Sequence, residues 1–582
     1  MIGEQSRFTS EKPDGLHGSV GLSVFSRASM RWTILIALVV LALGEELLAG
    51  EKIFLGTVRD RRTGVPLRSA GIQILDRSGF PIATTTTNSM GQWSVNVPVV
   101  GIENQNGLPA SFTLLQNYPN PFNPSTKIPF TIGKTGTVRI TVFNIVGQLV
   151  DAKEYVLHAG SYTVDWRSKG SAGVLFYSLE MDGGRLTRKM IQLDGGNSTG
   201  LSNISQMSSS PSYRFSTGFG TDSCNVIASS FVYEPDTISV AFVDSARADF
   251  SLESVHDRAF VVDLHNDVME VISGSNFTYQ ISDRHALVRN GDPQTDIPRL
   301  RDGGVDGQIF SIWIDPGRYA ASTHFSTAMK FLDTLKAQAG RNASDMGLVK
   351  SRDSLDALSA QKKISGIVVV EGGNCIEEKL GNLLAFFNAG VRVMTITWKI
   401  STSWAVSDQD SRAGTVGLND FGRQVIRTMD SLGMIIDVSH VGRKTIEDIL
   451  ATSTKPIIAS HSGAYAVCSN SRNLPDTLIR AIAARGGVVG IVFYPYYLTG
   501  SRTASLENVM QHIDYIRRLV GNVDCISLGS DFDGIEVTPS GLEDVTKFPA
   551  ITEALLQRGY SRQDVRKILG ENFMRVFRSV CK

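Results

Sequence analysis

The C-terminal half of the chain alternates short apolar runs with longer segments in which apolar residues recur every three or four positions. From about residue 257 onward, eight apolar runs end near Asn266, Trp313, Glu371, Trp398, His440, His461, Tyr494 and Asp531. The longer segments predict helices at Leu418–Leu432, Lys444–Thr452, Asp476–Arg485, Leu506–Val520, Ile551–Arg558 and Arg562–Phe577. Strands that alternate with helices form a parallel sheet. Residues 255–582 are therefore predicted to adopt an α/β fold, a (β/α)8 TIM barrel.

Residues 51–254 follow a different pattern, in which apolar and polar positions alternate one by one. This period places successive side chains on opposite faces of a strand. The Gly, Asn and Asp residues between the short stretches mark turns. We therefore predict an all-β region of sandwich modules that precedes the barrel.

Two parts of this region resemble known modules. Gly56–Asp60, together with Thr237–Ala241 much later in the chain, resembles a carboxypeptidase-regulatory-like β-sandwich. Between them, Leu115–Thr126 (LQNYPNPFNPST) resembles a type IX sorting domain. We predict a sorting-like β-module near residues 111–195, inserted into the first sandwich and followed by a Ser/Asn-rich linker at residues 196–216. Sorting domains usually close a chain, so the internal position leaves a structural spacer as the other interpretation.

The N-terminal segment has the pattern of a secretion signal. Arg31 stands before the apolar stretch Trp32–Gly44, and the small residues Ala49 and Gly50 follow it. An apolar stretch of this length is typical of a signal peptide and short for a membrane span. We interpret residues 1–50 as a signal-peptide region and expect a secreted or cell-envelope protein, periplasmic or extracellular. An uncleaved membrane anchor is the alternative interpretation.

Charge and cysteine content exclude several classes of function. Lys and Arg total 57, and Asp and Glu also total 57, so the formal net charge is zero. This balance provides no broad positive field, and no nucleic-acid partner is expected. The five cysteines are scattered without a Cys-x-x-Cys pair, which argues against a disulfide framework and against a thiolate zinc site.

Side chains that can bind a metal stand at the ends of four of the predicted barrel strands: His265, Asp267, Glu371, His440 and His461. The chemistry of a barrel lies where its strands end, because the loops that follow them converge there. Imidazole and carboxylate groups together suit zinc. His265 and Asp267 share one face of a strand, and the two oxygens of Glu371 could bridge two cations. The pattern indicates metal-assisted hydrolysis.

From about Arg258 to its C-terminus, the chain resembles the renal (membrane) dipeptidase family of binuclear zinc peptidases. Besides the five candidate ligands, the resemblance includes Thr295–Val305 (TDIPRLRDGGV), Leu432–Val441 (LGMIIDVSHV), Ser460–Tyr465 (SHSGAY) and Asp531–Gly534 (DFDG). It implies a barrel of the metal-dependent hydrolase type that hydrolyses dipeptides with a metal-bridging water.

The resemblance also implies a role for each candidate. His265 and Asp267 would bind one zinc ion. His440 and His461 would bind a second, with Glu371 as the bridge, which gives two Zn2+ per chain. Asp531 would be the carboxylate acid/base that handles the proton of the water.

Three further residues are candidates for binding substrate. Arg472 matches a substrate-binding position of the family, and Tyr494 stands at the end of the seventh apolar run. Trp398 stands where the family often has a histidine that helps to bind substrate near the scissile carbonyl. A tryptophan can stack or donate one hydrogen bond, but it cannot become a cation. The expected substrate is a dipeptide or another small amide.

Two other functions remain open. The same metal pair could serve another amidohydrolase reaction on a lactam or a related amide. That superfamily usually opens with His-x-His, whereas this chain has His-x-Asp, which favours the dipeptidase branch. Alternatively, the barrel could belong to a non-catalytic surface-binding protein. Cell-envelope association and a homodimer also remain open.

Overall fold

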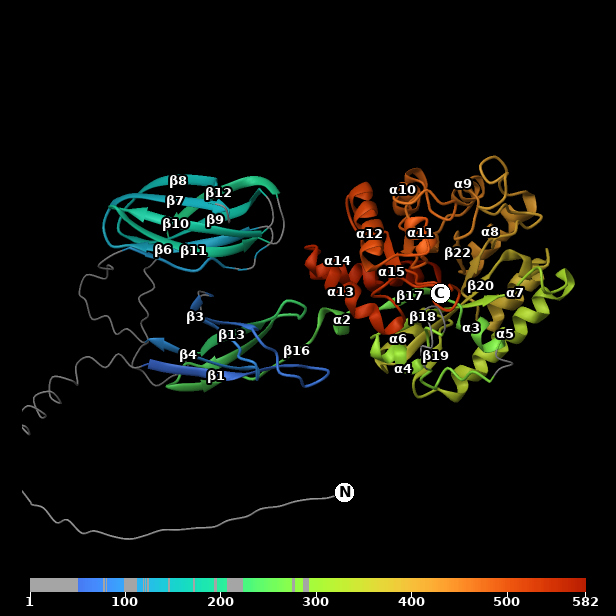
Figure 1. Cartoon of the computed structure of the whole chain (residues 1–582), viewed down its shortest axis with the longest axis horizontal. Coiled ribbons are helices and arrows are strands. Elements are labelled where there is room, and N and C mark those ends of the chain that lie inside the picture. Colours follow the sequence, from blue (N-terminus) through green and yellow to red (C-terminus); the bar gives the residue numbers. More distant parts are fainter. Residues whose placement is uncertain are drawn as a thin grey trace, which may run out of the picture.

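The computed structural model of the chain describes residues 51–76, 79, 81–98, 112–118, 120, 122, 125–144, 147–170, 173–192, 196–206, 223–274, 278–285 and 293–582 (Figure 1). The predicted signal-peptide region, residues 1–50, lies outside these residues. Within the described part of the chain, no helix is both long enough and apolar enough to cross a membrane.

The first β-sandwich takes its strands from two distant segments of the chain. They are β1 (Glu51–Asp60), β2 (Gly71–Leu75), β3 (Pro81–Thr86), β4 (Gln92–Pro98), β13 (Ser223–Ser229), β14 (Asp236–Ala241), β15 (Ser245–Arg247) and β16 (Phe250–Leu252). One sheet pairs β1 with β4, β15 and β16, and the other has the order β14-β13-β2-β3. Ile72 and Ile74 alternate along β2 and pack with Phe54 and Val226 in the core.

A second β-sandwich is inserted between β4 and β13. Its strands are β5 (Thr113–Leu114), β6 (Ser125–Ile132), β7 (Gly136–Asn144), β8 (Leu149–Leu157), β9 (Gly160–Gly170), β10 (Gly173–Met181), β11 (Gly184–Gln192) and β12 (Gly196–Gln206). The sheets have the orders β11-β10-β7-β8 and β12-β9-β6-β5. Trp166 and Tyr177 belong to a core that is separate from that of the first sandwich.

The linker predicted after residue 195 was wrong in its first part. Residues 196–206 form β12, which pairs antiparallel with β9 and shifts its register after Asn197 and after Leu201. The polar composition suggested a linker, but a strand of a β-sandwich needs few apolar residues, because one face packs on the core and the other faces solvent. Leu201 supplies that buried contact. Residues 207–222 lie outside the described residues.

The C-terminal region is the predicted parallel barrel. Its strands, in spatial order, are β17 (Val262–Asn266), β18 (Gly307–Trp313), β20 (Ile364–Glu371), β21 (Val393–Thr395), β22 (Ile435–Asp437), β23 (Ile458–Ser462), β24 (Val488–Ile491) and β25 (Ile526–Leu528). A parallel bridge between Asn266 and Phe532 joins the last strand region to the first. A short extra strand, β19 (Met346–Leu348), pairs with β20. The predicted TIM-barrel fold is confirmed.

Helices surround these strands (Figure 1). They are α2 (Val255–Arg258), α3 (Val268–Gly274), α4 (Ile297–Asp302), α5 (His324–Arg341), α6 (Arg352–Ala360), α7 (Leu380–Ala389), α8 (Asp420–Leu432), α9 (Arg443–Thr452), α10 (Asp476–Ala484), α11 (Pro495–Thr499), α12 (Leu506–Val520), α13 (Phe548–Gln557), α14 (Arg562–Arg566) and α15 (Asn572–Val580). In α12 a capping box at Ser505 starts the helix, and Gly521, with a φ of 84°, ends it. Its apolar residues Val509, Ile513 and Ile516 recur at helical spacing and are buried.

The last predicted helix, residues 562–577, is divided into α14, a π-helical turn (Lys567–Glu571) and α15. The turn packs against the start of the barrel. A side chain at Gly570 would place its Cβ 1.8 Å from the carbonyl oxygen of Phe260, immediately before β17. This segment therefore closes the N-terminal end of the barrel, opposite the end where the strands finish.

The first sandwich contacts the barrel near this closed end. Arg562 Nε donates a hydrogen bond to the carbonyl oxygen of Tyr233 at 3.1 Å, and Arg566 forms an ion pair with Glu234. Both arginines lie on α14. The buried cores of the sandwich and the barrel share no residue. The contacts between the two parts are thus mainly polar.

We expect the fragment 254–582 to fold alone, because it retains the barrel core and Ser254, whose side chain caps α2. Its melting temperature, measured by circular dichroism, should lie within a few degrees of that of the barrel in the full chain, since partly exposed ion pairs each contribute about 0–1 kcal/mol.

A fragment that begins at residue 260 is the matched control. It lacks Val255 and His256, which are buried, so it should melt earlier than the fragment 254–582. Insolubility of the longer fragment beside a soluble full chain would contradict the prediction.

Candidate active site

The predicted site residues lie at the C-terminal ends of the barrel strands. His265 is in β17, Glu371 is the last residue of β20, and His461 is in β23. Four strands are shorter than their apolar runs. They end at residues 395, 437, 491 and 528, each three residues before a site candidate: Trp398, His440, Tyr494 and Asp531. These four side chains are therefore on the loops that follow the strands.

Two of the loop residues have left-handed backbone conformations. The φ angle is 65° at His440 and 64° at Asp531. Such angles are uncommon for residues other than glycine and are found at sites where the surrounding structure enforces them. A backbone hydrogen bond holds each of the two residues in place. Asp408 N donates to His440 O at 2.9 Å, and Asp531 N donates to His265 O at 3.2 Å.

Glu371 lies between two groups of histidines and faces each with a different oxygen. Its Oε1 is 3.2 Å from His440 Nε2 and 3.8 Å from His461 Nε2. Its Oε2 is 3.2 Å from His265 Nε2, and His265 Nε2 is 3.4 Å from Asp267 Oδ2. One carboxylate therefore joins a pair of histidines on one side to a His–Asp pair on the other.

These separations fit zinc. Two ligand atoms bound to one Zn2+ at about 2.0–2.1 Å in tetrahedral geometry lie about 3.3 Å apart. The Nε2 atoms of His440 and His461 are 3.0 Å apart. His265 Nε2, the ring nitrogen that faces Glu371 and Asp267, is buried without a hydrogen-bond partner among the described residues. A bound cation would satisfy this nitrogen.

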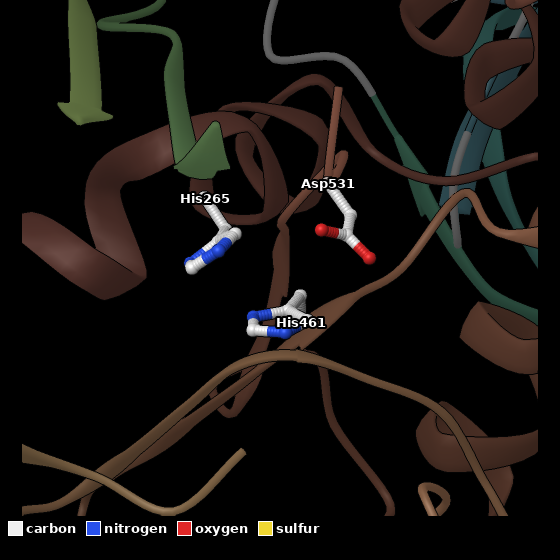
Figure 2. Close-up of side chains that lie close together, drawn as sticks. All are labelled: His265, His461 and Asp531. Atoms are coloured by element: carbon white, nitrogen blue, oxygen red, sulfur yellow. The ribbon is translucent and has the colours of Figure 1, made fainter. Parts of the chain in front are cut away.

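Asp531 completes a third group. Ligand atoms of His265, His461 and Asp531 lie within 4.8 Å of one another, and Figure 2 shows these three side chains pointing toward a common space. Burial raises the pKa of Asp531 well above its usual value; the charge of His265 opposes this shift, and the charge of Asp267 adds to it.

Asp533, the other carboxylate of the DFDG motif, turns away from the cluster. It accepts hydrogen bonds from the backbone N of Gln294 at 2.7 Å and from Asn266 Nδ2 at 3.4 Å. The last residue of the motif, Gly534, leaves no room for a side chain. A Cβ at this position would lie 2.2 Å from Asp267 Oδ2. Within this motif only Asp531 belongs to the candidate metal cluster.

The cluster favours the protonation states that bind metal at Glu371, His440 and His461, but not at His265. Burial lowers the pKa of His265, but the charges of Glu371 and Asp267 outweigh it and raise that pKa well above its usual value. Burial raises the pKa of Glu371, but the charges of His265 and His440 outweigh it and hold that pKa well below its usual value. Burial, followed by the charges of His265 and Arg472, lowers the pKa of His461 well below its usual value. Burial and Arg472 also lower the pKa of His440. An ionised carboxylate and neutral imidazoles are the forms that bind zinc.

Two buried aspartates support the cluster from below. Asp437 Oδ1 accepts a hydrogen bond from Ser460 N at 2.8 Å, and its Oδ2 accepts one from Ser460 Oγ at 2.7 Å. Asp263 holds Ser530 in the same way, with 2.7 Å to the backbone N and 2.7 Å to the hydroxyl. The two serines immediately precede His461 and Asp531. Each aspartate therefore sets the position of one residue of the site.

The serine beside His461 also sets its tautomer. Ser460 Oγ donates to Asp437 and lies 2.8 Å from His461 Nδ1, so it accepts a hydrogen bond from that nitrogen. With its proton on Nδ1, His461 presents the lone pair of Nε2 to the cluster. Outer-shell partners of this kind raise the affinity of a metal site.

A pocket with a volume of about 100 Å3 lies over the cluster. The cluster contributes Asp267, Glu371, His440 and Asp531 to its lining, and the walls are formed by Glu270, Trp313, Trp398, Lys399, Tyr494, Tyr497, Gly534, Ile535 and Glu536. Two of the predicted substrate-binding residues, Trp398 and Tyr494, therefore line the pocket.

The third predicted substrate-binding residue, Arg472, lies deeper. Its Nη2 donates to the carbonyl oxygen of His461 at 3.1 Å, and its guanidinium packs over the ring of Tyr497, 5.2 Å from the ring centre. The side chain is buried, its Nε has no hydrogen-bond partner, and no carboxylate pairs with it among the described residues. A buried guanidinium of this kind favours an anionic ligand.

Five polar or aromatic residues of the pocket were not predicted from the sequence: Glu270, Trp313, Lys399, Tyr497 and Glu536. Trp313 marked the end of a predicted strand and could have been found by the rule that strand ends carry the chemistry. Tyr497 is on α11, and its ring centre lies 4.8 Å from that of Tyr494, the residue that precedes this helix. Glu536 accepts a hydrogen bond from Tyr494 Oη at 2.8 Å, a contact between distant segments that no local pattern indicates.

A family model described as membrane dipeptidase (peptidase family M19) matches residues 251–582, more than half of the chain. The chain belongs to the membrane dipeptidase family. The resemblance inferred from the sequence motifs is thereby confirmed.

Members of the membrane dipeptidase family with known sequences or structures match the barrel region. Rat (Rattus norvegicus) Dipeptidase 3 is 33% identical over 326 residues, which covers 55% of this chain and 65% of the rat protein. The chain thus spans just under two thirds of the length of the curated relatives it matches.

Among solved structures, a metallo peptidase from Rhodobacter sphaeroides, liganded with a phosphinate mimic of the dipeptide L-Ala-D-Ala, is 25% identical to the chain. It matches with a TM-score of 0.51 over 55% of this chain and 99% of that one. Dipeptidase AC is 27% identical, with a TM-score of 0.51 over 55% of this chain and 98% of that one.

A second family model, the secretion system C-terminal sorting domain, matches residues 116–192 in the inserted sandwich. This domain indicates secretion or a cell-surface location, so the predicted secreted or envelope location is confirmed.

Replacement of Ser460 by alanine should lower the zinc affinity of the barrel about 10- to 100-fold, because it removes the hydroxyl that orients His461. Competition with a chelator measures this change. Ser460→Thr keeps a hydroxyl and should retain most of the affinity.

Ser527→Ala is the matched control, since Ser527 is a buried serine of β25 whose hydroxyl has no partner among the described residues. Equal affinities in Ser460→Ala and Ser527→Ala would show that the hydroxyl does not support the site.

Proposed function

We propose that the chain is a zinc-dependent dipeptidase that holds two Zn2+ at the C-terminal ends of its barrel strands. The division of the two Glu371 oxygens between separate donor groups carries this proposal. In it, His265 and Asp267 bind one zinc ion, and His440 and His461 bind the other. Glu371 bridges the two. Membership of the membrane dipeptidase family supports the reaction type.

Zinc ions bound there would polarise the scissile carbonyl and lower the pKa of a water molecule. The chain supplies the proton transfer. Asp531 lies beside His265 and His461, and burial raises its pKa toward the range in which a carboxyl can both accept and donate a proton. It would take a proton from the attacking water and return it to the leaving amine.

The pocket supplies the contacts that hold the substrate. Arg472, a buried cation without a carboxylate partner among the described residues, would attract the terminal carboxylate of a dipeptide. Tyr497 covers its guanidinium, so the carboxylate would approach beside or displace this ring. Trp398 and Tyr494 would bound the substrate on the pocket walls. Homodimer formation and envelope association stay predictions.

The direct test is hydrolysis of a panel of L,L- and L,D-dipeptides by zinc-loaded protein, with release of free amino acids as the measurement. Dipeptides with an N-acetyl group should be poor substrates. A protein that binds zinc but cleaves no dipeptide would contradict the proposal.

Glu371→Gln should weaken both metal sites, because it removes the ligand that they share. Elemental analysis after dialysis should find well below two zinc ions per chain. Glu536→Gln is the matched control, since this pocket carboxylate bonds to Tyr494 rather than to the cluster, and it should keep both ions. Full zinc content in Glu371→Gln would exclude a bridging role.

Asp531→Asn should lower kcat about 10²–10⁴-fold with both zinc ions still bound, because general acid–base catalysis typically contributes that much. Asp533→Asn should instead lower the melting temperature, since its carboxylate holds the segment at Gln294. Turnover by Asp531→Asn at the rate of the unmodified protein would exclude Asp531 as the base.

A further inference from the structure

Arg472, which lies beneath Tyr497 behind the pocket wall, and Trp313, which lines the pocket, belong to opposite sides of the barrel mouth. Arg472 follows β23, the sixth strand in spatial order, and Trp313 ends β18, the second. In a closed barrel of eight strands, the second and sixth strands are diametrically opposed. A ligand that extends from the Arg472 side across the cluster therefore reaches the side of Trp313.

An aromatic corner forms the Trp313 side. The ring centres of Trp313 and Trp398 are 4.8 Å apart, with the ring planes tilted by 53°. Trp398 is 6.3 Å from the ring of His440, so the corner adjoins the cluster. Lys399 covers the Trp398 ring, with its Nζ 4.8 Å from the ring centre. The two indoles offer a broad apolar surface beside the position of the scissile bond.

A carboxylate stands beside this corner. Glu270 is on the first turn of α3, where its backbone N donates to Asp267 O at 2.8 Å, and it contributes to the pocket lining. It forms no ion pair within the described part of the chain.

We propose that Trp313, Trp398 and Glu270 form the subsite for the N-terminal residue of the substrate. The indoles contact an apolar or aromatic side chain, and the Glu270 carboxylate accepts hydrogen bonds from the free ammonium group. The proposal rests on the proposed dipeptidase function, because it takes the carboxylate end of the substrate to lie toward Arg472. The two ends of an extended dipeptide point in opposite directions, so a carboxylate directed toward Arg472 leaves the ammonium group directed toward the Trp313 side.

This assignment separates dipeptides that differ only in the order of their residues. Phe-Gly presents its aromatic side chain to the corner, whereas Gly-Phe presents it on the Arg472 side. We expect Phe-Gly to have the higher kcat/KM.

The first experiment measures both dipeptides with the full-length protein and with Trp313→Ala. The substitution should lower kcat/KM for Phe-Gly about tenfold, mainly through KM, and change that for Gly-Phe less than twofold. Trp313→Leu, which keeps an apolar side chain, guards against a folding defect and should give an intermediate value for Phe-Gly. Equal losses on both dipeptides, or a larger loss on Gly-Phe, would overturn the subsite.

The ammonium contact has its own test. Glu270→Gln should raise KM for Phe-Gly about three- to tenfold and leave the weak activity on N-acetyl-Phe-Gly unchanged. Glu553→Gln, on the exposed face of α13, is the matched control and should match the unmodified protein on both. A Glu270→Gln variant with unchanged KM for Phe-Gly would overturn the role of Glu270.

A binding experiment distinguishes failure of the subsite from failure of the catalytic proposal. Isothermal titration of Phe-Gly and Gly-Phe into zinc-loaded Asp531→Asn protein, with and without Trp313→Ala, needs no turnover. Selective loss of Phe-Gly binding supports the subsite even if no dipeptide is hydrolysed. The subsite is overturned if both peptides bind and Trp313→Ala changes neither affinity. It is also overturned if neither peptide binds.

Discussion

The site depends on two buried carboxylates that tie neighbouring strands together. Asp437 on β22 accepts hydrogen bonds from Thr395 on β21 and Ser460 on β23, and Asp263 on β17 accepts them from Gln308 on β18 and from Ser530 after β25. The two are on the first and fifth strands, so each clamps three strands on opposite sides of the barrel. Removal of one hydrogen-bond donor from such a buried carboxyl group typically costs about 1–3 kcal/mol. The barrel mouth is therefore held at two points, and both points lie next to residues of the cluster.

The hydrogen bonds of Asp263 and Asp437 explain how the chain tolerates unfavourable backbone angles and buried ionisable groups at the C-terminal end of the barrel. His440 and Asp531 have positive φ angles, and the cluster gathers ionisable groups with little access to water. Neither arrangement is favourable alone. Buried hydrogen bonds contribute about 0.5–1.5 kcal/mol each. Those of Asp263 and Asp437 hold Ser530 and Ser460, which immediately precede Asp531 and His461. Stability is thus supplied by the layer beneath the cluster rather than by the cluster itself.

Much of this arrangement was predictable from the sequence, because strand ends in a parallel barrel converge. That rule brought His265, Glu371 and His461 together correctly. It did not show that four strands end three residues early, because the apolar runs continue into buried loops. The rule about strand ends also did not predict two contacts between side chains. Tyr497 covers the guanidinium of Arg472, and the rings of Trp313 and Trp398 pack together. Such contacts join loops of different strands, and no periodicity along the chain encodes them. The prediction of a linker at residues 196–206 was wrong for another reason, because a polar edge strand and a linker have similar compositions.

The insertion of one sandwich into another constrains the order in which the protein can form during synthesis. β2 pairs with β13, so Ile74 meets Val226 only after the whole inserted module has been made. The module closes all its strand pairs within residues 113–206 and can fold while the outer sandwich is still incomplete. Non-local pairing of this kind is slow, and unpaired strands invite wrong partners. The sorting module of a nascent chain can therefore be complete before the outer sandwich is complete and before any part of the barrel has been synthesised. Export machinery that recognises this module would then meet a chain that still lacks its catalytic half.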